Sequence, residues 1–173
     1  MLPAVAALLA VSLPTTSAIG PKLHLRQNTG HYYVFIETPM KWNDADKFAK
    51  KFSFKVRDSV VLDKWHLATI TSADENNYVF GVVLEEGRVT GDAVFLGAIV
   101  KDGSLHNFNW VTGEPFRYKN WAPGQPDFER ENVLEMGGIF GAQWNNEDGP
   151  GSPSEASHPF ILEHEPIKIT QLR

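Results

Sequence analysis

The chain has 173 residues, of which 42% are hydrophobic and 21% are charged, and its formal net charge is -5 at pH 7. This length and composition predict one globular domain with enough apolar residues for a core. Acidic and basic residues are interspersed, which argues against a nucleic-acid-binding surface because such a surface needs clustered Lys and Arg. The absence of cysteine from the sequence excludes disulfides, cysteine catalysis and thiolate metal sites.

The N-terminal segment, residues 1–18, carries no charged side chain. Its apolar run is too short to span a bilayer, and Thr16-Ser17-Ala18 supplies the small residues typical of a signal-peptidase site. We therefore expect a signal peptide over 1–18 and a secreted or extracellular protein, with a periplasmic location as the alternative. A truncated or misassigned start is the other interpretation of this segment.

Residues 19–29 form a polar lead-in of uncertain order. The aromatic and β-branched residues at 30–36 predict a strand. Thr38 and Pro39 then predict a helix start, with Thr38 as the N-cap and Pro39 at the first helical position. The helix that follows has apolar residues at helical spacing, namely Trp42, Ala45, Phe48, Ala49 and Phe52.

Residues 53–65 are mixed and charged and predict a loop or an insertion, before a short strand at 66–70. Ser72 and Glu75 have the spacing of a capping box, in which the Ser side chain accepts from the Glu amide and the Glu side chain reaches back. The second helix begins there and is expected to end near Gly87. Its apolar face is formed by Tyr78, Val79, Val82 and Val83.

The second half of the sequence predicts short strands separated by turns. The apolar run at 94–100 predicts a central buried strand, and the turn Asp102-Gly103 leads into a paired strand at 105–110. A long loop is expected at 119–132, and a loop rich in Gly, Pro and Ser at 149–157. The remaining strands are predicted at 133–136, 142–144 and 159–163.

Amide and carboxylate oxygens are concentrated in and after the Asn120–Asp127 stretch. Gln125 and Asn145 offer amide carbonyls, and Asp127 and Glu131 offer carboxylates. Calcium takes six to eight oxygen ligands, so these residue types predict a site for a hard cation or a polyhydroxylated ligand. The alternative is a loop whose polar side chains serve only its turns and the solvent. Trp121 and Trp144, which bracket this stretch, are expected to anchor it in the core.

Several motifs resemble, in their order along the chain, the C-type lectin-like domain family. They are His66-Leu67-Ala68-Thr69-Ile70 with Glu75-Asn76, Phe95-Leu96-Gly97-Ala98, Phe108 to Pro115 leading into Asn120-Trp121, Gln125-Pro126-Asp127, Glu131, Trp144-Asn145 and Phe160-Ile161-Leu162-Glu163. The resemblance covers residues 30–165 and leaves 166–173 as a C-terminal tail. It implies an α+β fold with two helices on short antiparallel sheets and a long ligand-binding loop.

The resemblance also implies a calcium-dependent lectin that binds glycans and catalyses no reaction. The order amide-Pro-acid in Gln125-Pro126-Asp127 is similar to the galactose-type motif, and the family holds this proline in cis. The implied calcium ligands are Gln125, Asp127, Glu131, Asn145 and Asn146. The implied sugar contacts are Gln125, Asp127, Phe128, Glu131 and Asn145.

The sequence departs from the family pattern in this loop. Asn146 stands where the family has an aspartate, which should weaken calcium binding because affinity depends on ligand charge. Glu147 or Asp148 could compensate, and Glu129 could replace Glu131 because the spacing after Asp127 is short. These departures keep open a second interpretation, a calcium-independent module of the same fold that binds a protein or cell-surface partner.

Other departures and motifs point away from further chemistry. Val133 and Leu162 stand where the family has cysteines, so packing should replace the disulfides. The sequence has no serine nucleophile motif and no phosphate-binding loop, so we expect no enzyme. Glu163-His164-Glu165 is expected to be solvated charge. No pair of histidines has the spacing of a zinc-binding helix, and each is expected to be a surface or satisfied core residue: His24, His31, His66, His106, His158 and His164.

Overall fold

The computed structural model describes residues 21–57, 60–85, 93–101, 104, 107–127 and 130–167. The predicted signal peptide, the helix end at Gly87, the turn Asp102-Gly103 and the side chains of Phe128 and Glu129 lie outside these residues. Within the described ranges, neither helix has the length and hydropathy needed to cross a membrane.

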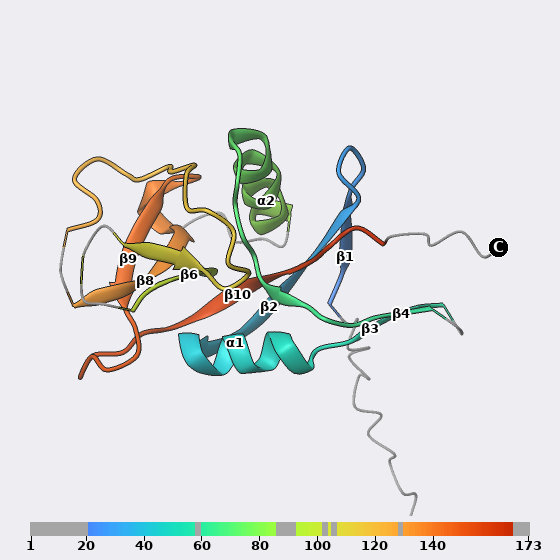
Figure 1. The fold of residues 1–173 in the computed structure, drawn as a ribbon, viewed down its shortest axis with the longest axis horizontal. Helices are drawn as coiled ribbons and strands as arrows, with labels where there is room; N and C mark the ends of the chain where they lie inside the picture. Colours follow the sequence, from blue (N-terminus) through green and yellow to red (C-terminus); the bar gives the residue numbers. More distant parts are fainter. Residues whose placement is uncertain are drawn as a thin grey trace, which may run out of the picture.

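One eight-stranded sheet organises the fold (Figure 1), in the order β1-β2-β10-β6-β8-β9, with β5 paired to β10 and β7 to β6. Within the described residues its only parallel pairing joins β10 to β6. Its strands are β1 (Leu23–Arg26), β2 (His31–Lys41), β5 (His66–Leu67), β6 (Ala93–Val100), β7 (Phe108–Trp110), β8 (Glu131–Gly137), β9 (Trp144–Asp148) and β10 (Ser157–His164). A short 3-10 helix, η1 (Gly138–Phe140), joins β8 to β9.

The two helices, α1 (Trp42–Lys51) and α2 (Ala73–Glu85), lie on opposite sides of β2 and β10 (Figure 1). This arrangement buries both faces of β2. Tyr33 and Phe35 belong to the core that includes α2, whereas Val34 and Ile36 belong to the core that includes α1. A strand covered on both faces has apolar residues at consecutive positions, and for this reason the residues at 30–36 predict a strand.

The first helix begins later than predicted. It starts at Trp42 with Lys41 at the N-cap, so the prediction that Thr38 caps it was wrong. The strand β2 continues to Lys41 instead, because its pairing with β10 resumes at Met40, opposite His158. The ladder is irregular between these pairs and Ile36, where Pro39 has no N–H to donate. The predicted apolar face is confirmed by the burial of Trp42, Ala45 and Ala49.

Two segments without a predicted strand contain strands. Residues 53–65 include a hairpin, β3 (Phe54–Arg57) and β4 (Val60–Leu62), which forms a separate two-stranded sheet. The lead-in at 19–29 contains β1, whose inward-facing residues are His24 and Arg26. Hydrophobic alternation could not reveal β1 because the residues that point inward are polar.

Apolar packing is found at the two positions where it was predicted to replace disulfides. Val133 and Leu162 are fully buried in the core that contains α1. Val133 also lies against Gly149, where an added Cβ would come within 2.4 Å of Val133 Cγ1. Both strands therefore gain close apolar contact at positions where the family pattern has cysteine.

Candidate ligand-binding loop

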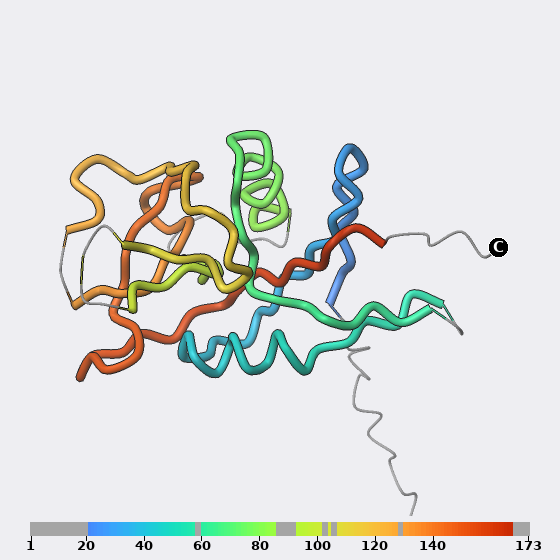
Figure 2. The backbone as a smooth tube through the Cα atoms, in the orientation of Figure 1, coloured from blue at the N-terminus to red at the C-terminus, as the bar shows by residue number. Residues whose placement is uncertain are grey.

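The long loop is attached to the sheet through its two tryptophans. Trp121 forms a β-bridge with Trp144, and the backbone hydrogen bonds Trp144 N–H to Asn120 O (2.8 Å) and Ala122 N–H to Trp144 O (2.9 Å) extend it. The Trp144 indole is fully buried and donates from Nε1 to Asn76 Oδ1 at 2.7 Å. Both rings therefore serve as core anchors, as predicted. Figure 2 shows the loop (yellow to orange) beside β8 and β9, with the β3–β4 hairpin at the other end of the molecule.

The peptide bond between Gln125 and Pro126 is cis, which confirms the prediction made for this motif. A turn precedes it, since the N–H of Gln125 donates to Ala122 O at 3.0 Å and Gly124 has a φ of +89°. Only glycine adopts that φ without strain. The Gln125 side chain carries a buried carbonyl oxygen, Oε1, that has no hydrogen-bond partner.

The carboxyl groups of Asp127 and Glu131 lie within hydrogen-bonding reach of each other. Burial raises the pKa of Glu131 to about 7, and the neighbouring charges of Asp127, Glu147 and Asp148 act in the same direction. A carboxyl group among three other acids is stabilised by a proton or by a cation. This carboxyl pair is therefore the part of the loop that favours a bound cation.

Asn146 ties the loop to the sheet with its side-chain amide. Its Oδ1 accepts from the backbone N–H of Asp127 at 3.1 Å, and its Nδ2 donates to the carbonyl oxygen of Glu131 at 3.2 Å. The residue is fully buried. The amide therefore holds together, without a metal, the two residues that carry the loop carboxylates.

Asn145 faces the other side of β9. Successive side chains in a strand alternate between faces, and Asn145 lies opposite Glu135 whereas Asn146 lies opposite Leu134. The Nδ2 of Asn145 donates to Glu135 Oε1 at 2.9 Å. The structure thus gathers Asp127, Glu131 and Asn146 around the loop and directs the Asn145 amide toward Glu135.

The two residues expected to compensate for Asn146 have other partners. Asp148 accepts hydrogen bonds from Ser152 Oγ at 2.8 Å and Ser154 Oγ at 2.5 Å, so its carboxylate closes the 149–157 loop. Glu147 Oε1 accepts from the N–H of Asp148 at 2.7 Å, and its Oε2 lies 3.9 Å from His158 Nε2. Neither carboxylate replaces the charge that Asn146 lacks.

These groups can be tested against the needs of calcium. Gln125 Oε1 is buried without a hydrogen-bond partner, and two adjacent carboxylates follow it in the same loop. That donor set suits a hard cation. It offers few protein oxygens, because the Asn146 amide is already hydrogen-bonded to the backbone and the Asn145 side chain points to Glu135. The residues therefore fit a calcium site that is weaker than one with a full set of charged ligands.

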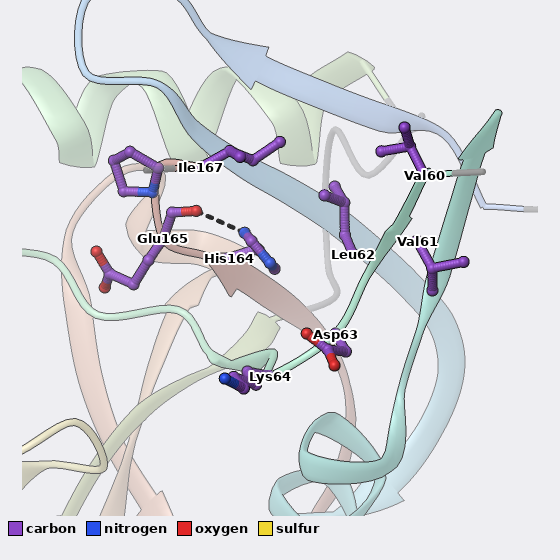
Figure 3. Close-up of a pocket in the computed structure, with 9 residues that line it drawn as sticks. Val60, Val61, Leu62, Asp63, Lys64, His164, Glu165 and Ile167 are labelled. Carbon is purple, nitrogen blue, oxygen red and sulfur yellow. Dashed lines mark hydrogen bonds between the residues drawn. The ribbon is translucent and has the colours of Figure 1, made fainter. Parts of the chain in front are cut away.

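A separate surface pocket of about 480 Å³ lies between β4 and the end of β10 (Figure 3). Val60, Val61 and Ile167 give it apolar walls, and His164 beside it donates from Nδ1 to the carbonyl oxygen of Glu165 at 2.5 Å. No predicted ligand-binding residue lines this pocket. It therefore offers no support to the loop chemistry.

Comparison with known proteins identifies similar sequences and folds, although no family model matches the chain. C-type lectin domain family 10 member A of Mus musculus is 29% identical over 107 residues, which cover 61% of this chain and 29% of that protein. The chain thus spans less than a third of this relative's length.

Solved structures share the fold. Human lithostathine has a TM-score of 0.67 at 17% identity, covering 92% of this chain and 99% of that one. A calcium-independent type II antifreeze protein has a TM-score of 0.61 at 20% identity, covering 85% and 92%. The chain therefore has the C-type lectin-like fold, and part of its sequence is similar to a C-type lectin domain protein.

Proposed function

We propose that this chain is a secreted carbohydrate-binding domain whose long loop binds calcium and a galactose-type glycan. The observation that carries the proposal is the adjacent pair of carboxyl groups, Asp127 and Glu131, in a loop that also holds the buried, unpartnered Gln125 Oε1. The order Gln-Pro-Asp supports the galactose-type assignment by its resemblance to that motif. The lectin name of the mouse relative supports binding rather than catalysis.

The chemistry would be recognition through directional hydrogen bonds. Calcium, when bound, supplies the charge that draws two neighbouring sugar hydroxyls into the loop. Asp127 and Glu131 accept hydrogen bonds from those hydroxyls, and the Gln125 NH2 group donates one. Because carboxylates only accept and the amide also donates, the arrangement selects the orientation of the hydroxyls.

A thermal unfolding series with calcium tests the metal. A ligand of the native state raises the melting temperature by mass action, so millimolar calcium should raise it in the wild type and not in Asp127→Asn. Glu165→Gln, which removes an exposed carboxylate elsewhere, is the matched control and should respond like the wild type. An unchanged wild-type melting temperature would eliminate calcium binding.

Retention on immobilised galactose tests the sugar. Retention should be lost in chelator and in Asp127→Asn, and retained in Glu165→Gln. Stronger retention on immobilised mannose than on galactose would contradict the galactose-type assignment while leaving calcium binding intact.

A second candidate function is a calcium-independent module that binds a protein or cell-surface partner. The observation that favours it is Asn146, whose amide hydrogen-bonds the backbone of both Asp127 and Glu131. The fold it shares with a calcium-independent antifreeze protein adds support at the level of fold. Equal capture of a partner with and without chelator would favour this function, whereas chelator-sensitive capture would exclude it.

A further inference from the structure

Three strands of the large sheet bring metal-binding side chains together away from the long loop. Glu135 comes from β8, Glu147 from β9 and His158 from the start of β10. Each offers one ligand atom, and these atoms all lie within 4.8 Å of one another. Sequence patterns gave no sign of the cluster because the three residues belong to different strands and share no motif spacing.

The distances between the ligand atoms suit a small cation. His158 Nε2 lies 3.4 Å from Glu135 Oε2 and 3.9 Å from Glu147 Oε2. Zinc bonds of about 2.0–2.1 Å in a tetrahedron place neighbouring ligand atoms about 3.3–3.4 Å apart. A small inward movement of the part-exposed Glu147 side chain would complete three such contacts.

Buried oxygens point to an absent ligand. Glu135 is only 5% exposed, and its Oε2 has no hydrogen-bond partner. The Oδ1 of Asn145 is also buried without a hydrogen bond, while its Nδ2 donates to Glu135 Oε1 and orients that carboxylate. A buried carboxylate oxygen without a hydrogen bond is costly, and a cation would remove that cost.

The His31, Glu75 and Glu163 cluster provides a contrast within the same molecule, since its ligand atoms also lie within 4.8 Å of one another. There the carboxylates are already hydrogen-bonded to the protein. Glu75 accepts from Arg26 and Thr71, Glu163 accepts from the N–H of Thr69, and the Tyr33 hydroxyl lies between them with one proton for either carboxylate. Proximity therefore does not distinguish the two clusters, but the Glu135 Oε2 atom does, because it has no hydrogen bond and its contact with His158 at 3.4 Å is an ion pair only.

The ligand types and their exposure favour zinc over calcium. Imidazole nitrogen and carboxylate oxygen are ligand types that zinc takes in four-coordinate sites, whereas calcium takes six to eight oxygens. The ring of Phe95 packs edge-on against the His158 imidazole, with the ring centroids 4.9 Å apart, and orients it. Glu147 and His158 are partly exposed, so a metal ion can enter from solvent and retain a bound water.

We propose that Glu135, Glu147 and His158 form a zinc-class divalent metal site, with the Asn145 carbonyl as an adjacent neutral oxygen. The site lies on the opposite face of β9 from Asn146 and the long loop, because Asn145 and Glu147 alternate with Asn146 along the strand. Its three ligands differ from those of the proposed sugar site, although the charge of Glu147 acts on Glu131. The sequence patterns assigned Glu135 and His158 to no chemistry.

Titration of the metal-free chain with Co²⁺, followed by Zn²⁺ competition, tests the site. One equivalent of Co²⁺ should give a visible absorption band that Zn²⁺ abolishes. Glu135→Gln and His158→Gln should each weaken binding by more than about tenfold. Asp127→Asn in the loop and His164→Gln at the end of β10 are controls that should bind like the wild type. Millimolar calcium should leave the wild-type spectrum unchanged.

Several results would overturn the site. They are a wild-type chain without the Co²⁺ band, a band that both Glu135→Gln and His158→Gln leave intact, and a band lost on calcium addition or in Asp127→Asn. Loss of the band on calcium addition, or in Asp127→Asn, would place the ion in the long loop. Circular dichroism of each variant separates loss of the site from loss of the fold, and the calcium competition uses only the wild type.

Discussion

The backbone N–H of Asp127 donates to the side-chain oxygen of Asn146 across 3.1 Å, which joins the tip of the long loop to β9. The same amide donates to the carbonyl oxygen of Glu131. The residue that departs from the family pattern therefore ties the loop to the sheet through two hydrogen bonds. An aspartate in its place would keep the first hydrogen bond and lose the second, because a carboxylate has no donor.

Asn146→Asp should separate stability from metal affinity. In chelator, the lost donor and an added charge beside Asp127 and Glu131 should lower the free energy of unfolding by roughly 1–3 kcal/mol. In calcium, the added charge should tighten binding. Urea unfolding with and without calcium measures both effects.

Asn146→Ala is the control for that variant. It removes the tie without adding charge, so it should destabilise the chain and bring no gain in calcium affinity. Equal calcium responses in the Asp and Ala variants would show that position 146 does not contact the ion.

The hydrogen bond between His31 Nδ1 and Glu163 Oε1, at 2.6 Å, should make stability depend on pH. It raises the pKa of His31 above its ordinary value, against the opposing effect of burial. The folded state then binds the proton more tightly, so the stabilisation is full below about pH 6.5 and is lost as pH rises through the folded pKa.

The stability difference between the wild type and His31→Gln should therefore be largest below about pH 6.5 and shrink as the pH rises through the raised folded pKa of His31. Urea unfolding at several pH values measures it, and comparing the two proteins cancels the titration of Glu131. A constant difference across this range would refute the role of His31.

Tyr33 links two buried carboxylates, since its hydroxyl lies 2.9 Å from Glu75 Oε1 and 3.0 Å from Glu163 Oε1. Burial, together with these two charges, raises the pKa of Tyr33, so the hydroxyl keeps its proton. Tyr33→Phe leaves the carboxylates with one donor fewer and should cost roughly 1–3 kcal/mol. Tyr32→Phe on the same strand is the control and should change the unfolding free energy by less than about 0.5 kcal/mol.

Gly149 cannot take a side chain without displacing its neighbours. A Cβ there would lie 2.3 Å from Asn132 Oδ1 and 2.4 Å from Val133 Cγ1. Gly149→Ala should therefore destabilise the chain by about 1–3 kcal/mol through overpacking. Combined with Val133→Ala, it should cost less than the sum of the single changes, because the smaller residue makes room.

Gly81 in α2 is the matched control, since an added Cβ there meets nothing within 4 Å. Gly81→Ala should stabilise the chain by up to about 1 kcal/mol, as expected for alanine in a helix. Additive losses in the Gly149 and Val133 double variant would show that the two positions do not compete for space.

Local patterns in the chain were sufficient for the presence of both helices and the central strands, whereas the fold class followed from the resemblance of its ordered motifs to a family. The apolar runs of β2, β6 and β10 identify strands buried on both faces, and Ser72 and Glu75 mark the start of α2, where the Glu75 N–H donates to Ser72 Oγ at 3.2 Å. The cis bond before Pro126 followed from the resemblance of its motif. These features depend on neighbours in the sequence, which the sequence displays directly.

Only the tertiary structure decided which polar side chains meet. The Arg26 side chain points inward because it forms an ion pair with Glu75 of α2, with Nη1 and Oε1 3.3 Å apart. Asn145 and Asn146 are adjacent in sequence, yet strand alternation directs one to Glu135 and the other to the long loop. The cluster of Glu135, Glu147 and His158 exists because β8, β9 and β10 lie near one another in the sheet. Such contacts join residues that are distant in the chain, so no local sequence pattern predicts them.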